Sequence, residues 1–271
     1  MRNSLVRMLW SHQLTFHWTA LTSLGNQASG YFVYRDGAFY AGEAFASPSD
    51  EGTTLNFADL SVTSGMHTYS LQPNNTDDGM PVSVMSKPVS VTLDTTTPTI
   101  KYSASPVANA EGWNKDNVTV TFSCSDDVQV ASCSSPVTLS TEGAGQTVTG
   151  TAVDEAGNST SVITSAINID KTPPTASGVT LSSGLILLAG TENISASVND
   201  TLSGVTGGEC YVDSDPGQGR GTAMAYSAGK LTASKTFGLG SLSVGSHTLY
   251  VRSQDKAGNW STVASRPFTY L

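Results

Sequence analysis

Four histidines are the side chains of this sequence best suited to acid–base chemistry. His67 and His247 stand at the same place in two similar segments, Gly65-Met66-His67-Thr68 and Gly245-Ser246-His247-Thr248. A catalytic base has no reason to recur with each repeat, whereas a structural position does. We therefore interpret both histidines as structural. The sequence contains no Gly-x-Ser-x-Gly elbow, phosphate loop or zinc motif, so we predict no catalytic residue, no cofactor and no enzymatic activity.

Two of the three cysteines, Cys124 and Cys133, lie close together in TFSCSDDVQVASCSS. Val118, Val120 and Phe122 alternate with Cys124, which predicts that Cys124 points into the core. We expect a disulfide between the two cysteines, because the composition is typical of secreted proteins, and so short a loop contributes roughly 2–3 kcal/mol. The alternative is a pair of buried, reduced thiols. No metal site is expected, since no second pair of cysteines or histidines stands at ligand spacing.

The remaining cysteine, Cys210, lies in GECYVD. Aligning ASVND with FSCSD places Val198 where Cys124 stands, and Cys210 then falls near the equivalent of Cys133. One half of the pair is therefore present, and an apolar side chain fills the other place. We expect Cys210 to be a buried, reduced thiol of low reactivity.

Aspartates gather where the repeated segments end. The set comprises Asp94, Asp126, Asp127, Asp154, Asp170, Asp200 and Asp255. Calcium prefers such carboxylates, and strand ends that meet at a linker could bring several together. Turn capping by each aspartate accounts for every one of them individually. We therefore predict no metal site and leave open whether calcium binds at the junctions.

Trp113 and Trp260 each stand beside a turn. An exposed indole in such a place can stack on a sugar ring, which makes the two residues candidates for carbohydrate binding. More often a tryptophan beside a turn covers the end of its own core. No row of aromatic residues at regular spacing supports a larger carbohydrate platform.

The composition indicates which elements must position these residues. Only 13% of the 271 residues are charged, and serine, threonine, glycine and valine are abundant, which favours many short strands over helices. The formal net charge of −9 argues against nucleic-acid binding. No apolar run approaches the ~20 residues of a membrane-spanning helix. The first residues hold no apolar segment long enough for a signal peptide. Because the cysteines nevertheless indicate export, we expect this chain to be a segment of a longer protein, and we expect the segment to be monomeric.

The stretch from Thr147 to Pro174 gives the clearest secondary-structure pattern. Val148, Gly150 and Ala152 alternate with threonines, as in a half-buried strand. The segment Asp154–Asn158 then has the residues of a tight turn. A long strand rich in threonine, serine and isoleucine is expected to follow and to end at two prolines.

Parts of this stretch recur along the chain. The linker Asp170–Pro174 has a near copy in Asp94–Pro98, and the turn Asp154–Asn158 (DEAGN) returns as Asp255–Asn259 (DKAGN). Self-similarity at this spacing is the pattern of a tandem array. The predicted modules are residues 1–97, 98–173 and 174–271.

Both the first and the second module resemble known families. Trp18, the run Tyr31-Phe32-Val33-Tyr34, and Tyr69 match the positions of conserved aromatic residues in fibronectin type III domains. Gly112-Trp113-Asn114, together with the cysteine pair, the DEAGN turn and the Asp-Pro linker, resembles the Ig-like repeats of large secreted and surface-attached bacterial proteins. The resemblance implies an extracellular or cell-surface location.

We therefore predict an all-β fold of three tandem β-sandwiches. Residues 1–97 are expected to be fibronectin type III-like, residues 98–173 bacterial Ig-like with the disulfide, and residues 174–271 bacterial Ig-like. Short proline-containing linkers predict an extended rod on the order of 100 Å long. The expected function is that of a non-catalytic spacer or adhesion segment of a secreted or surface-attached bacterial protein, with an unidentified protein or glycan partner. The alternative is an accessory carbohydrate-binding region of a secreted hydrolase.

Overall fold

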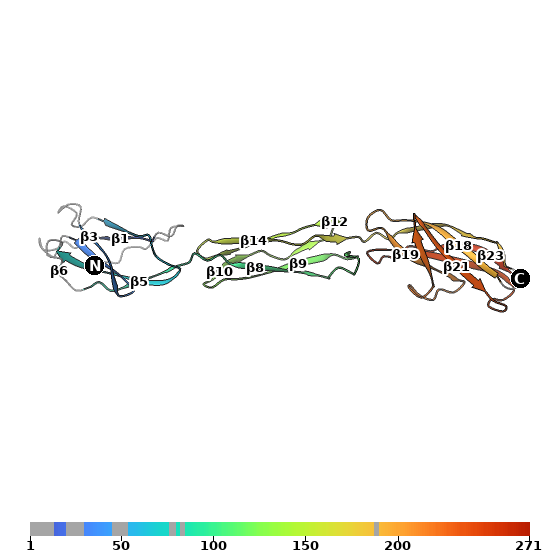
Figure 1. Ribbon diagram of the computed structural model, residues 1–271, viewed down its shortest axis with the longest axis horizontal. Coiled ribbons are helices and arrows are strands. Elements are labelled where there is room, and N and C mark those ends of the chain that lie inside the picture. Colours follow the sequence, from blue (N-terminus) through green and yellow to red (C-terminus); the bar gives the residue numbers. More distant parts are fainter. Residues whose placement is uncertain (1–13, 20–29, 45–53, 76–79, 82–84, 187–189) are drawn as a thin grey trace. The chain divides into compact units, whose positions relative to one another are not determined.

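The computed structural model describes residues 14–19, 30–44, 54–75, 80–81, 85–186 and 190–271 (Figure 1). In these ranges every regular element is a β-strand, so the prediction of an all-β fold is confirmed. The chain divides into two compact units. The first unit comprises Met1–Ile100, Cys124–Cys133 and Thr151–Ser161, and the second comprises Lys101–Ser123, Ser134–Gly150 and Val162–Leu271.

The N-terminal strands all belong to the first unit. They are β1 (Leu14–Thr19), β2 (Gly30–Arg35), β3 (Ala38–Ala44), β4 (Thr54–Asp59), β5 (Gly65–Asn75), β6 (Met80–Pro81) and β7 (Val89–Leu93). β1 pairs with β4, whereas β3, β2, β5 and β6 form a second sheet with β7 also on β5. Asp36 and Gly37 connect β2 to β3 with positive φ angles of 54° and 80°. This is the two-residue hairpin that an Asp-Gly pair favours.

Alternation along these strands builds the core of the first unit. Tyr31 and Val33 on β2 are buried, and their β5 neighbour Tyr69 is 4% exposed. The other buried members are Val62, Val91 and Leu93. The aromatic residues at 31 and 69 on which the fibronectin type III resemblance depended are therefore core residues, whereas the side chain of Trp18 lies outside the described part of the structure.

Strands β8 to β15 contribute residues to both units. They are β8 (Thr99–Ser105), β9 (Val118–Ser125), β10 (Val130–Cys133), β11 (Val137–Leu139), β12 (Gly143–Gln146), β13 (Thr149–Asp154), β14 (Ser159–Ile163) and β15 (Ile167–Ile169). Three small sheets result, in the orders β11-β9-β8, β10-β13-β14 and β12-β15.

The stretch that begins at Thr147 differs from the prediction in one respect. β13 and the turn at Asp154–Asn158 form as expected, but the long strand after them is divided into β14 and β15. The break has a local cause, because the Val148 N–H donates to Thr164 Oγ1 at 3.0 Å and the Thr164 N–H returns to the Val148 carbonyl at 3.0 Å. Beyond this break the chain leaves β13 and pairs with β12 instead.

Packing against Phe122 explains why position 150, in β13, is a glycine. A Cβ atom built there would lie 2.3 Å from the ring of Phe122, which is 8% exposed. The aromatic ring therefore occupies the space that a side chain at position 150 would need. The equivalent position in the last module is Val251, which is fully buried.

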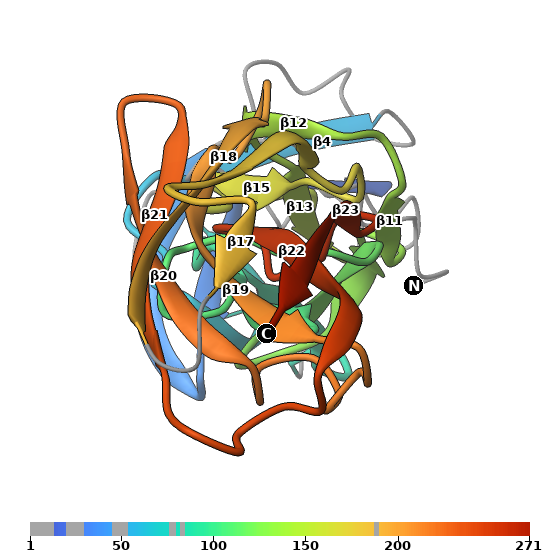
Figure 2. The same ribbon diagram turned by 90° about the vertical axis from the view of Figure 1, so that its right-hand side faces the viewer.

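The C-terminal strands belong to the second unit (Figure 2). They are β16 (Thr175–Leu181), β17 (Leu185–Ile186), β18 (Gly190–Asn199), β19 (Val205–Val212), β20 (Thr222–Ser227), β21 (Lys230–Phe237), β22 (Gly245–Asp255) and β23 (Ala264–Tyr270). Their order is β16-β18-β21-β20-β19-β22-β23-β17, in which the last pair is parallel. The core between them includes Ile194, Leu231 and Leu249, each at most 1% exposed.

Each sheet draws its strands from a single predicted module. The module boundaries and the extended rod themselves stay predictions. Within the described ranges, no helix has the length and apolarity needed to cross a membrane.

Candidate functional site

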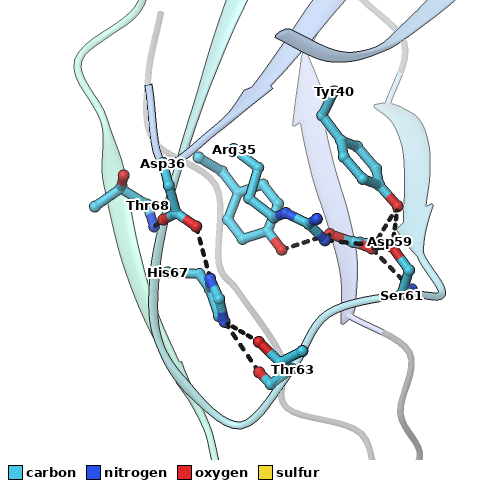
Figure 3. Close-up of polar contacts among 9 residues, drawn as sticks. Arg35, Asp36, Tyr40, Asp59, Ser61, Thr63, His67 and Thr68 are labelled. Carbon is cyan, nitrogen blue, oxygen red and sulfur yellow. Dashed lines mark hydrogen bonds and ion pairs between the residues drawn. The ribbon is translucent and has the colours of Figure 1, made fainter. Parts of the chain in front are cut away.

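A buried carboxylate at the end of β4 organises the polar contacts of the first unit (Figure 3). The Asp59 side chain is 0% exposed. Its Oδ2 accepts from Arg35 Nη1 at 2.8 Å and from the Tyr69 hydroxyl at 2.7 Å. Its Oδ1 accepts from the Tyr40 hydroxyl at 2.7 Å and from the Ser61 N–H at 3.0 Å. Asp59 therefore joins three strands and the loop after β4.

These contacts decide the protonation state of Asp59. Burial by itself would raise the pKa of the carboxyl, but hydrogen bonds from Tyr40, Tyr69, Ser61 and Arg35 outweigh it and lower the pKa to about 2. Burial and the negative charge of Asp59 raise the pKa of Tyr69. The Arg35 guanidinium also lies over the ring of Tyr40, 4.3 Å from the ring centroid. The network is saturated with internal partners, which favours a structural role.

His67 makes a second polar corner beside this network (Figure 3). Its Nδ1 lies 2.8 Å from Asp36 Oδ2, and its Nε2 lies 3.0 Å from the carbonyl oxygen of Thr63. Asp36 Oδ1 accepts from the Thr68 N–H at 2.8 Å. The histidine thus ties the β2–β3 turn to the start of β5.

The same corner is repeated in the second unit. His247 Nδ1 lies 2.6 Å from Asp213 Oδ2, its Nε2 lies 2.7 Å from the Ser243 carbonyl oxygen, and the Thr248 N–H donates to Asp213 Oδ1 at 2.9 Å. Asp213 has a φ of 55°, close to the 54° of Asp36. His247 and Asp213 have the relative orientation of a catalytic base and the carboxylate that orients it. However, His247 Nε2, the nitrogen that would take a proton from a substrate, already hydrogen-bonds to the Ser243 carbonyl. This geometry favours the structural interpretation of both histidines; His12 and the side chain of His17 lie outside the described residues.

We expect the His247 corner to make the second unit less stable as pH rises. The Asp213 carboxylate and the Ser243 carbonyl raise the pKa of His247 above its ordinary 6.5, against the opposing effect of burial. Because the folded pKa is the higher one, the stabilisation is complete below about 6.5 and is lost as pH rises through the folded value. NMR titration of the His247 ring should give a pKa above 6.5, and the pH dependence of unfolding should shrink in His247→Gln. A pKa at or below 6.5 would contradict the prediction.

Cys124 and Cys133 are joined by a disulfide with an S–S distance of 2.01 Å and a Cα–Cα distance of 5.9 Å. The expectation that Cys124 points into the core is wrong in part. Val118 and Val120 on the same face of β9 are at most 1% exposed, but Cys124 is only half-buried and Cys133 is exposed. Phe122, two residues earlier on the same face, is still buried at 8% exposed, so the coverage of this face falls off only at the last position of the alternation.

Cys210 is a free, fully buried cysteine on β19. Burial raises the pKa of its thiol, so the reactive thiolate is disfavoured. Val198 is buried in the same core, as the alignment of the two modules predicted.

The DEAGN and DKAGN turns clamp the linkers in the same way. Asn158 Nδ2 donates to the main-chain oxygen of Asp94 at 3.1 Å and to Asp154 Oδ2 at 2.8 Å. Asn259 Nδ2 donates to the main-chain oxygen of Asp170 at 2.9 Å and to the side chain of its own turn aspartate at 2.8 Å. Each turn asparagine therefore holds the linker aspartate that precedes its module.

The junction aspartates also approach one another. Carboxylate oxygens of Asp94, Asp126 and Asp127 lie within 4.8 Å of one another, as do those of Asp170, Asp200 and Asp255. Several of these carboxylates cap backbone N–H groups: Asp94 accepts from Thr96, Asp126 from Val128, Asp170 from Thr172 and Ser203, and Asp200 from Leu202 and Gly204. Burial, with a smaller effect from the charge of Asp170, raises the pKa of Asp255. Turn capping therefore remains our interpretation of these residues.

The two candidate tryptophans, Trp113 and Trp260, have different surroundings. The Arg252 guanidinium lies over the ring of Trp260, 5.5 Å from the ring centroid, so that indole already has a partner. Trp113 is half-buried and lines a surface hollow of about 360 Å³. Of these two tryptophans, Trp113 therefore has the better position to stack on a ligand.

No protein-family model matches the chain, and no curated protein matches it. Among solved structures, fibronectin(III)-like modules of Clostridium thermocellum CbhA are 14% identical, with a TM-score of 0.36 over 64% of this chain and 94% of theirs. A tetra-tandem repeat from the extending region of a large adhesion protein is 15% identical, with a TM-score of 0.34 over 97% of this chain and 72% of that one. At TM-scores this low, neither structure carries an argument about this chain. The all-β fold rests on the strands and sheets of the structure itself.

Two networks were not found by sequence reasoning. One is centred on Asp59, and the other joins Arg252 to Glu209 and Asp215, with Arg252 Nε 2.6 Å from Glu209 Oε1. The sequence did offer one sign of the second network, which is a charged residue within a predicted apolar strand. Arg252 directly follows Val251, and Glu209 directly precedes Cys210. The sequence did not show which charges would meet.

Proposed function

We propose that this chain is a non-catalytic spacer segment of a secreted or surface-attached bacterial protein. Its modules hold a distal domain away from the point where the protein is attached, or contact a partner there. The observation that carries the proposal is the asparagine clamp, which recurs at both linkers. Asn158 and Asn259 each bond to the linker aspartate carbonyl at 3.1 and 2.9 Å. A spacer sets the distance between the domains at its two ends, and the same stiff linker at each module boundary would keep that distance constant.

The linker residues add to the restraint at each joint. Pro98 and Pro174 are both buried, and proline fixes its own φ near −65°. Asp94 and Asp170 cap the N–H of the residue two positions on, at 3.0 and 3.1 Å. Few torsions at either linker are therefore free to vary, which supports a stiff connection.

The disulfide supports the proposed location. Cytosolic thiols are kept reduced, whereas disulfides persist in secreted and surface proteins. The exposed position of Cys133 leaves the bond accessible to cellular reductants, so it would last best outside the cytosol.

The test of the spacer function removes the clamp. In the double variant Asn158→Ala with Asn259→Ala, each lost amide hydrogen bond should weaken its joint by about 0.5–1.5 kcal/mol, since a net hydrogen bond contributes that much. Small-angle X-ray scattering should show a rod on the order of 100 Å for the unmodified chain, and a smaller radius of gyration with a broader distance distribution for the variant.

Asn193→Ala is the matched control, because this exposed asparagine accepts from Ser234 on a sheet face at 2.8 Å and, among the described residues, makes no hydrogen bond to either linker. Its scattering profile should equal that of the unmodified chain. A compact profile for the unmodified chain, or an unchanged profile for the double variant, would contradict the spacer proposal.

One observation favours the second function, an accessory carbohydrate-binding region. Trp113 lines a hollow, with the polar residues Asn109, Lys115 and Asp116 beside it. A spacer can carry such a site, so the two functions are compatible and need separate tests.

A further inference from the structure

The Trp113 hollow is a surface cavity with a volume of about 360 Å³, and all the residues that line it belong to the second unit. Its apolar part is formed by Pro106, Val107, Trp113 and Ala257, and Val107 is 85% exposed. Sites for small ligands have volumes of about 300–1,000 Å³. The hollow is therefore large enough for one sugar ring, and its apolar wall is open to solvent.

The Trp113 loop is held in place before any ligand arrives. Asn109 Oδ1 accepts from the Trp113 N–H at 3.0 Å, and the Asn109 N–H donates to the Trp113 carbonyl at 2.9 Å. Asn168 Nδ2 donates to the Gly112 carbonyl at 2.9 Å, and Asn109 Nδ2 donates to the Lys256 carbonyl at 2.7 Å. A loop fixed on both sides loses little entropy when it binds, which favours a binding role for its aromatic ring.

Two charged side chains at the hollow have unused hydrogen-bonding capacity. Among the described residues, neither Lys115 nor Asp116 makes a side-chain hydrogen bond or ion pair, and both are exposed. A lysine only donates and a carboxylate only accepts, whereas a sugar hydroxyl does both. The hollow thus combines an indole with one donor and one acceptor.

We propose that the Trp113 hollow binds a neutral pyranose unit of a polysaccharide. The apolar C–H face of the ring lies against the indole, whose negative face attracts the C–H groups. Hydroxyls at the ring edge bond to Asp116 and Lys115. The opposite charges of these two residues cancel, and the net charge of −9 repels acidic glycans, so a neutral sugar fits best.

This proposal rests on the second proposed function, carbohydrate binding, and not on the spacer function. Glycan binding is read from affinity, whereas the spacer function is read from scattering, so either proposal can fail while the other stands.

The test begins with the complete chain on an array of neutral and acidic glycans. Isothermal titration then measures the affinity for cellohexaose, laminarihexaose and maltohexaose. We expect at least one neutral glycan to bind with a Kd between about 1 μM and 1 mM. No neutral binding at about 10 mM, or binding of acidic glycans only, overturns the proposal.

Variants then locate the site. Trp113→Ala should weaken binding at least about tenfold, and Asp116→Asn about tenfold, since a hydrogen bond to a charged group is stronger than one to a neutral group. Tyr226→Ala is the matched control, because this aromatic side chain is 42% exposed on β20 and lies outside the hollow. Asp116 is exposed and without a side-chain partner in the described structure, so its variant tests the site even where Trp113→Ala is unstable. Affinity unchanged in both Trp113→Ala and Asp116→Asn, or equally reduced in Tyr226→Ala, overturns the proposal.

Discussion

Replacing Asp59 by alanine should destabilise the first unit by about 3–5 kcal/mol, as expected when one partner of a buried ion pair is removed. The carboxylate is 0% exposed and accepts hydrogen bonds from Arg35, Tyr40, Tyr69 and the Ser61 N–H. Alanine would leave these donors without their shared acceptor, and a cavity in its place.

Hydrogen exchange of the β5 amides measures this loss directly, because a chain with more than one unit need not unfold in a single transition. Ser61→Ala is the control, since Ser61 is exposed and its hydroxyl is one of several groups around Asp59. It should reduce stability by less than about 1 kcal/mol. A loss below about 1 kcal/mol in Asp59→Ala itself would show that the network contributes little.

The pH dependence of the same network has a definite sign. The folded pKa of Asp59, about 2, lies below its ordinary 3.8. A lowered carboxyl pKa stabilises the fold above the ordinary value, and the contribution is lost as pH falls toward the folded value. The first unit should therefore keep the contribution of Asp59 from neutral pH down to about pH 4 and lose it between about pH 4 and 2.

Local patterns predicted the strands and turns, because those features depend on neighbouring residues. Alternation at Val118 and Val120 identified a strand whose inner face is buried. The Asp36-Gly37 pair is of a type that favours a two-residue hairpin, and both residues have positive φ. The repeated DxAGN segments predicted equivalent turns, and Gly157 and Gly258 have φ angles of 91° and 95°. These residues specify their conformation largely by themselves.

Contacts between distant residues could not be predicted in the same way. Arg35, Asp59 and Tyr69 lie on three strands, and no spacing in the sequence indicates that they meet. Their contact depends on the register of β2 with β5, in which Arg35 is opposite Tyr69. Asp59, at the end of a strand, was as consistent with a capped turn as with a buried charge.

Alternation also predicts a face without predicting how well that face is covered. Cys124 has the parity of Val118, Val120 and Phe122, yet it is only half-buried whereas those three residues are buried. The position of Trp113 has a similar explanation. Its sequence neighbours do not show that Ala257, far along the chain, completes the wall of its hollow.

The second large effect is expected at Arg252, which is 4% exposed on β22. Its Nε lies 2.6 Å from Glu209 Oε1, and its two terminal nitrogens each lie 3.0 Å from Asp215. Leucine at position 252 would leave the Glu209 side chain, 3% exposed, as a buried charge without its cation. We expect the second unit to lose about 3–5 kcal/mol, measured by hydrogen exchange of the β22 amides.

Two further variants identify the cause of that loss. Asp215→Ala removes a partner whose side chain is 52% exposed, and should reduce stability by about 1 kcal/mol or less. The double variant Arg252→Leu with Glu209→Met replaces both buried charges by apolar side chains, which is often neutral for a buried pair. It should therefore recover much of the loss, although the Gly219 and Gly221 N–H groups lose their acceptor. If the double variant is no more stable than Arg252→Leu alone, the unpaired charge of Glu209 does not dominate the loss. The packing of Arg252 against Tyr211 and Trp260, or the acceptor that the Gly219 and Gly221 N–H groups lose, then accounts for it.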